Sequence, residues 1–274
     1  KLCEAKLPKS VDFVSHEVEY VFCDRCDHVN GACEDTEAFY ESLYVQDDGA
    51  EYASNYIDKN FKSRAIEIYL PKVDYLIDTL PYKPERILDV GCGAGYFVYG
   101  ASLRDLEAVG VDVSKKMVEF GNSQIKSLNG SSPLQVVDEE GFLNCIKNAD
   151  VDVISAISVI EHLRSPHSFF EAFRQSKAKY LYYSVPMFSL SVALESVSDD
   201  IFPRQLSGGH THVFTESSIK RMHRIMRISS VGEWRFGTDF MDFYRHLMVK
   251  LEEKSVSRKM LSRVADAIVP HIDK

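Results

Sequence analysis

The stretch Ile87-Leu88-Asp89-Val90-Gly91-Cys92-Gly93-Ala94-Gly95-Tyr96-Phe97 predicts a buried strand that runs into a glycine-rich turn and then into a helix. Ile87, Leu88 and Val90 supply the apolar run that is typical of a central parallel strand covered on both faces. The three glycines indicate a backbone that turns sharply and approaches a ligand closely. We therefore expect a nucleotide-like cofactor at this turn.

Two features of the turn argue against a dinucleotide. Its glycines are spaced Gly-x-Gly-x-Gly, and Tyr96 stands where a dinucleotide fingerprint has its last glycine. A pyrophosphate binds at a helix N-terminus because the amide dipoles attract anions, and Asp89 would repel it there. A cofactor that carries a sulfonium and an ammonium group would instead be attracted to this carboxylate.

The sequence LDVGCGAG at residues 88–95, together with GVDVS at Gly110 to Ser114, resembles the first two motifs of class I S-adenosylmethionine-dependent methyltransferases. The resemblance implies an α/β fold with a doubly wound, mostly parallel sheet. It also implies an enzyme that uses S-adenosyl-L-methionine as its methyl donor. The cofactor-binding residues expected on this basis are Asp89, Gly91, Cys92, Gly93, Gly95, Asp112, Val113, Asp138, Glu139 and Ser158.

Acidic residues follow the next two expected strands, at residues 109–113 and 134–137. Asp112 lies at the offset from the glycine turn where an acidic residue accepts hydrogen bonds from ribose hydroxyls. Its alternative role as a helix cap is better filled by Ser114. In similar enzymes an acidic residue at the position of Asp138 meets the adenine amino group. A solvated loop carboxylate is the alternative reading for Asp138 and for Glu139.

The fourth expected strand, at residues 151–157, leads into a loop that carries Glu161 and His162. Ligands of open α/β sheets bind outside the carboxyl ends of the strands, so both side chains are expected at the reaction zone. Quinone-biosynthesis O-methyltransferases and small-RNA methyltransferases have a similar loop, with an additional glutamate that helps bind a divalent metal. Ser158 occupies that position here, which argues against metal-assisted chemistry.

A second histidine motif lies in the segment from residue 186 to residue 214, which we expect to bind the acceptor because long loops often carry function. His210 and His212 are two residues apart in an extended stretch, so their side chains point the same way. Related glycan and sugar methyltransferases have a similar His-x-His. A hydroxyl acceptor needs a base, and histidine suits neutral pH. The predicted catalytic residues are His162, His210, His212 and Glu161, while a structural loop histidine or a surface pair is the alternative.

Four of the six cysteines fall within the first 33 residues. Cys23 and Cys26 form a Cys-x-x-Cys knuckle, which follows an expected strand at residues 18–22. The separation of Cys3 from this knuckle is that seen between the two halves of a zinc ribbon. We predict that these three thiols bind a structural zinc ion. The fourth ligand would lie just ahead of Lys1 or be one of His28, Cys33 and His16. Unpaired cytosolic thiols are the alternative.

The 274 residues are expected to form four parts. These are a zinc-ribbon-like segment at 1–34, a helical connector at 35–84, the methyltransferase domain at 85–237 and C-terminal helices at 238–274. The domain should also contain a fifth strand at 181–185 and a last strand near 228–236, with Trp234 in the core. The C-terminal helices pack either on the domain or on a second subunit, which would give a homodimer.

The net charge of the sequence indicates which kinds of partner are disfavoured. A formal net charge of -9 disfavours nonspecific nucleic-acid or anionic-membrane partners. The sequence has neither an apolar run long enough to span a bilayer nor a secretory-type leader, so we expect a cytoplasmic protein.

A cysteine knuckle joined by helices to this kind of domain resembles sugar-modifying methyltransferases of antibiotic and surface-glycan pathways. We therefore predict methyl transfer to a sugar or glycan intermediate. The alternatives are a small phenolic or quinone-like acceptor, a catalytically silent S-adenosylmethionine-binding module and, as a third class, a dehydrogenase.

Overall fold

The computed structural model describes residues 2–3, 5–15, 18–31, 60–128, 130, 133–197, 206, 210–235, 239–254, 257, 259–260 and 262–264. Residues 35–59 of the predicted connector, and Gly208 and Gly209 of the predicted acceptor loop, lie outside these ranges. The chain divides into two compact units. The first comprises Lys1–Glu4, Glu34–Val185 and Ile219–Gly232, and the second Ala5–Cys33, Pro186–Ser218 and Glu233–Lys274.

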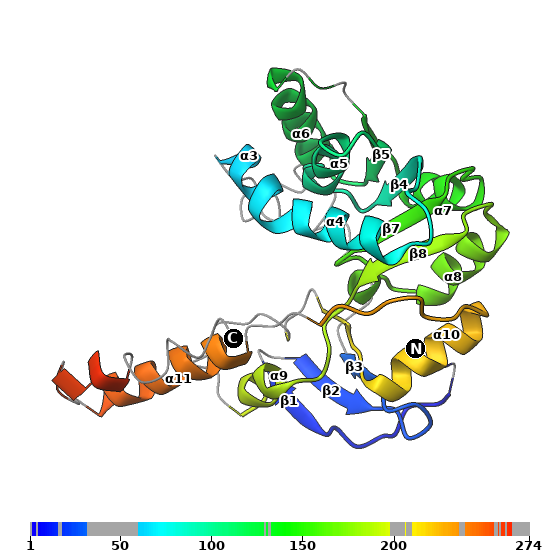
Figure 1. Ribbon diagram of the computed structural model, residues 1–274. Coiled ribbons are helices and arrows are strands. Elements are labelled where there is room, and N and C mark those ends of the chain that lie inside the picture. Colours follow the sequence, from blue (N-terminus) through cyan, green and yellow to red (C-terminus); the bar gives the residue numbers. More distant parts are fainter. Residues whose placement is uncertain are drawn as a thin grey trace. The chain divides into compact units, whose positions relative to one another are not determined.

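The first unit is built on a five-stranded parallel sheet in the order β6-β5-β4-β7-β8 (Figure 1). Its strands are β4 (Arg86–Val90), β5 (Glu107–Asp112), β6 (Leu134–Val136), β7 (Val153–Ile157) and β8 (Tyr180–Ser184). The glycine turn follows β4, the central strand, which is buried at every residue except its first. The predicted fold class is confirmed.

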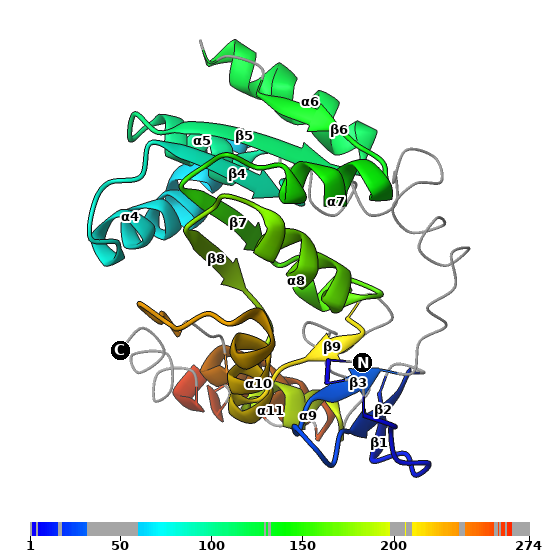
Figure 2. The same ribbon diagram turned by 90° about the vertical axis from the view of Figure 1, so that its right-hand side faces the viewer.

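Helices cover both faces of this sheet. Figure 2 shows α4 and α5 on one face and α7 and α8 on the other. The helices and helical turns are α3 (Phe61–Arg64), η3 (Ala65–Tyr69), α4 (Leu70–Thr79), α5 (Tyr96–Ser102), α6 (Lys115–Ser127), α7 (Glu139–Lys147), η4 (Ile160–His162) and α8 (Pro166–Gln175). One core cluster joins Val73 of α4 and Phe97 of α5 to Ile87 and Val153 of the sheet. This packing fixes the strand that leads into the glycine turn.

The second unit contains a four-stranded antiparallel sheet in the order β1-β2-β3-β9. The strands are β1 (Phe13–Ser15), β2 (Val18–Phe22), β3 (Val29–Gly31) and β9 (His212–Val213). The strand predicted at residues 18–22 is confirmed as β2. Helices α9 (Leu190–Glu195) and α11 (Asp239–Glu253) also belong to this unit. Helix α10 (Glu216–Met226) begins in it, but its residues from Ile219 onward belong to the first unit.

The strand predicted near residues 228–236 is wrong. No strand is present between residues 228 and 235, all of which are described. Val231 is 61% exposed and Trp234 is 40% exposed, so the tryptophan does not lie in the core. The apolar residues Ile228, Val231 and Trp234 recur every third position, which cannot put them on one face of a strand.

Among the described residues, no helix has the length and apolar character that crossing a bilayer requires.

Candidate functional site

The backbone of the glycine turn requires its glycines. Gly91, Gly93 and Gly95 have φ angles of 67°, 53° and 75°, in the left-handed region that favours glycine. A Cβ on Gly91 would lie 2.5 Å from a methyl group of Val159, and one on Gly95 would lie 2.6 Å from Leu134. Substitution at Gly91 or Gly95 would therefore move the turn. With glycine at these positions, a ligand at the turn would meet its backbone.

Asp112, at the end of β5, is bonded to this turn. Its Oδ2 accepts a hydrogen bond from the amide of Gly93 at 2.7 Å, and its Oδ1 accepts one from the amide of Ser114 at 2.8 Å. Burial raises the pKa of Asp112, while these amides lower it. Ser114 caps α6 by accepting from the amide of Met117, which confirms the predicted cap. Asp112 thus stands beside the turn, and its binding of ribose stays a prediction.

Asp89 lies in β4 and is 3% exposed. Its Oδ1 accepts a hydrogen bond from Ser155 Oγ at 2.7 Å. Burial raises the pKa of Asp89 to about 7, with a further rise from the charge of Asp112. The buried carboxylate of Asp89 and the half-buried carboxylate of Asp112, next to a glycine turn, suit a ligand that combines a cation with hydroxyl groups, and they would repel a pyrophosphate. The residues present therefore fit S-adenosylmethionine.

Two other expected cofactor residues lie in the same turn region. The Sγ of Cys92 is 3.6 Å from the carbonyl oxygen of Gly93, and burial strongly raises the pKa of this thiol. It therefore stays protonated at neutral pH. Val113 is half-buried between Asp112 and Ser114. Cys92 is part of the turn itself, and Val113 follows the end of β5.

Asp138 and Glu139 follow β6 and are exposed. The Oδ1 of Asp138 accepts from the amide of Gly141 at 2.7 Å, so this carboxylate caps α7. Glu139 forms an ion pair with Arg164 at 2.5 Å. These local roles account for both residues, and contact with adenine stays a prediction.

The loop after β7 holds three of the predicted site residues. Ser158 has a φ of 56°, which is strained for a residue with a side chain, and its amide donates to Ser184 Oγ at 3.0 Å. Glu161 is 2% exposed, and burial raises its pKa to about 8. His162 is half-buried and ends η4. Because β7 and β4 are parallel neighbours, this loop and the glycine turn leave the same edge of the sheet.

The other two predicted histidines belong to the second unit. His212 is fully buried in β9, and its Nδ1 lies 2.8 Å from Nε2 of His28. The ring of Phe214 packs against His28 with centroids 4.7 Å apart. His212 therefore contributes to the core of the small sheet. His210, just before β9, is half-buried. No observation tests either one as a base.

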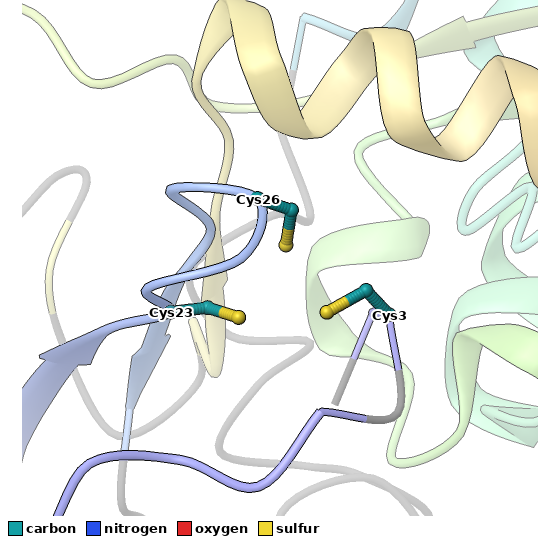
Figure 3. A group of neighbouring side chains, drawn as sticks. All are labelled: Cys3, Cys23 and Cys26. Carbon is teal, nitrogen blue, oxygen red and sulfur yellow. The ribbon is translucent and has the colours of Figure 1, made fainter.

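The three predicted metal-binding cysteines come together (Figure 3). The Sγ atoms of Cys3, Cys23 and Cys26 lie within 4.8 Å of one another, and all three residues are buried. The amide of Cys23 donates to the carbonyl of His28, and the amide of Asp27 donates to that of Cys23, which shapes the knuckle. Tetrahedral zinc with bonds of about 2.3 Å needs sulfurs roughly 3.8 Å apart, so the group fits zinc.

Three residues were predicted as candidates for a fourth zinc ligand, and only one of them lies within the described residues. His16 and Cys33 lie outside the described residues. His28 is fully buried, and its Nε2 contacts His212. The fourth ligand therefore stays unassigned.

Two residues of the site were missed by sequence reasoning. A Cβ on Gly121, in the middle of α6, would lie 2.2 Å from the carbonyl oxygen of Ala94, so α6 packs directly on the glycine turn. Ser155 supports Asp89. Each had a sequence signal, because a glycine inside a helix and a serine inside an apolar strand both cost stability unless packing or a hydrogen bond requires them.

Comparison with known proteins gives a consistent result. A family model described as a methyltransferase domain matches residues 61–224. The ubiquinone biosynthesis O-methyltransferase of Dechloromonas aromatica is 22% identical over 123 residues, which are 44% of this chain and 53% of that protein. The corresponding enzyme of Chromobacterium violaceum is 24% identical over 132 residues, covering 45% and 53%. The chain thus spans about half the length of these curated relatives.

A solved structure supports the fold. The magnesium protoporphyrin IX methyltransferase of Synechocystis PCC 6803 with bound SAH superposes with a TM-score of 0.51 at 16% identity, covering 70% of this chain and 89% of that one. At this identity the likeness concerns the fold alone.

Proposed function

Because the chain belongs to the family of methyltransferase domains, we propose that it transfers the methyl group of S-adenosylmethionine to a hydroxyl of a small phenolic or quinone-like acceptor. The two relatives named above are O-methyltransferases of ubiquinone biosynthesis, which favours this acceptor class. The sugar or glycan acceptor predicted from the sequence has no support from them.

The observation that carries the proposal is the position of the Glu161–His162 loop. Val159 lies so close to Gly91 that a Cβ on Gly91 would be 2.5 Å from a methyl group of Val159. The loop after β7 is therefore packed on the glycine turn, and η4 begins at the next residue, Ile160. This packing supports the proposal that His162 acts where a cofactor held by the turn would meet its acceptor.

Bound S-adenosylmethionine supplies a methyl group on a positively charged sulfur. Asp89 would hold its cationic end, and Asp112 would hold the ribose hydroxyls. A neutral imidazole nitrogen of His162 would take the proton from the acceptor hydroxyl, because histidine is largely unprotonated near pH 7. Glu161, with a pKa of about 8, keeps its proton at that pH and adds no negative charge beside the histidine.

The test is mass spectrometry of catechols, hydroquinones and nucleotide sugars incubated with the protein and S-adenosylmethionine. A single added methyl group on a phenolic acceptor is expected. His162→Asn should lower kcat by about 10²- to 10⁴-fold and leave cofactor affinity unchanged. The matched control is His167→Asn, because His167 is also half-buried but bonds to the carbonyl of Leu2. Methylation of nucleotide sugars alone, or full turnover by His162→Asn, would contradict the proposal.

We further propose that Cys3, Cys23 and Cys26 bind one structural zinc ion. The proximity of the three buried thiols supports this, and a small segment of this kind gains stability from a metal. Metal analysis of the purified protein should find about one zinc per chain. A metal content near zero in the reduced, undenatured protein would contradict the proposal.

A further inference from the structure

A buried serine supports the carboxylate of the glycine strand. Ser155 lies at the centre of β7, whose other residues are all apolar, and its side chain is fully buried. The parallel register of β4 and β7 places it beside Asp89, and its Oγ donates a hydrogen bond to Asp89 Oδ1 at 2.7 Å. Burying a hydroxyl is costly unless it finds a partner. This bond is therefore the reason that a serine can stand at this position.

The bond occupies only one oxygen of the carboxylate. Oδ2 of Asp89 accepts no hydrogen bond from the part of the chain that the structure describes. We propose that Ser155 is a positioning residue for cofactor binding, which holds Asp89 ionised and oriented so that Oδ2 meets the cationic end of S-adenosylmethionine. This inference rests on the proposed function.

The other groups that face Asp89 explain why such a donor is needed. They are Asp112 from β5, Cys92 from the glycine turn and Tyr69 from η3, whose own partner is Arg64. Neither the carboxylate, the thiol nor the phenol is a cation, and burial itself favours the protonated acid. Ser155 opposes these effects, because its hydrogen bond lowers the pKa of Asp89.

The experiment is calorimetric titration of the full chain with S-adenosylmethionine between pH 6 and pH 9.5. In Ser155→Ala the pH at which affinity is half-maximal should rise by about one unit. Affinity should then fall roughly fivefold at pH 7 and differ little at pH 9. The matched control is Ser102→Ala, because Ser102 also donates a hydrogen bond of 2.7 Å, to the carbonyl of Tyr99 at the end of α5. It should leave the midpoint unchanged.

A background variant tests the route of the effect. In Asp89→Asn the substitution Ser155→Ala should produce no pH-dependent change in affinity. An unchanged midpoint in Ser155→Ala, or a loss of affinity that is equal at every pH, would overturn the inference, because a purely structural role predicts the latter. If Ser155→Ala does not fold, Ser155→Cys provides the same test with a much weaker donor. Failure of the unmodified protein to bind the cofactor would refute the proposed function instead.

Discussion

Replacing Asp89 with asparagine should stabilise the cofactor-free protein above neutral pH. Asp89 is 3% exposed, and its pKa in the folded protein is about 7. In an unfolded chain an aspartate has a pKa of about 3.9. The folded state therefore binds the proton more tightly. The stability that this proton contributes is fully present below about pH 4 and is lost as the pH rises through 7.

The size of the effect follows from the two pKa values. A difference of about three pKa units, at about 1.4 kcal/mol each, amounts to a loss on the order of 4 kcal/mol of unfolding free energy. Asparagine has almost the same shape, and its Oδ1 can still accept from Ser155 Oγ, but it has no charge to bury. The variant should therefore lose none of its unfolding free energy through this carboxylate as the pH rises. The difference in unfolding free energy in its favour over the original protein should grow by roughly 2 to 3 kcal/mol between pH 5 and pH 8.

Urea denaturation without cofactor at pH 5, 6, 7 and 8 measures this directly. Glu161, whose pKa is about 8, titrates in both proteins and cancels in the comparison. Asp78→Asn, which removes an exposed carboxylate from α4, is the control and should follow the pH dependence of the original protein. A raised pKa of Asp89 is refuted if the difference in unfolding free energy between Asp89→Asn and the original protein is constant across this pH range, or if Asp89→Asn is the less stable protein at pH 8. In the same variant, affinity for S-adenosylmethionine should fall by about 10-fold or more, because a charged hydrogen-bond acceptor is lost.

Three further outcomes are expected. Gly121→Ala should lower the unfolding free energy by about 1 to 3 kcal/mol and weaken cofactor binding, because its Cβ would lie 2.2 Å from the carbonyl oxygen of Ala94. This loss is expected even though alanine favours helices. A more stable variant in thermal melts would contradict this packing. Ser158→Gly should be neutral or stabilising by up to about 1 kcal/mol in urea titrations, since it relieves a φ of 56°. Cys26→Ser should lose bound zinc and lower the thermal midpoint, and a chelator should lower the midpoint of the original protein only, as followed by circular dichroism.

The central sheet could be predicted from the sequence because its strands are short buried runs that end at turn residues. The glycine turn, the cap at Ser114 and the strand at residues 18–22 were predicted for the same local reason, and the structure confirms them. The expected methyltransferase family is likewise confirmed, because a family model of a methyltransferase domain matches residues 61–224. What these features share is that the residues which determine them are close together in the chain.

Features that depend on distant contacts could not be predicted. β9 has only two residues and pairs with β3, so no periodic pattern in its own sequence reveals it. Its pairing with β3 is what buries His212 beside His28, a location that the His-x-His spacing alone does not indicate. The sheet order and the contact between Gly121 and Ala94 also join residues far apart along the chain.

The misses and the proposed chemistry have a common physical basis. Asp89, Ser155 and Gly121 each reduce stability when considered alone, as a buried charge, a buried hydroxyl and a helical glycine. The glycine turn explains each of them. Asp89 supplies the charge, Ser155 bonds to that carboxylate, and Gly121 lets α6 approach the backbone of the turn. Residues that break a local rule at one place indicate that a ligand or a close contact offsets their cost there. The cofactor site is therefore best located by the positions where the sequence departs from ordinary strand and helix patterns.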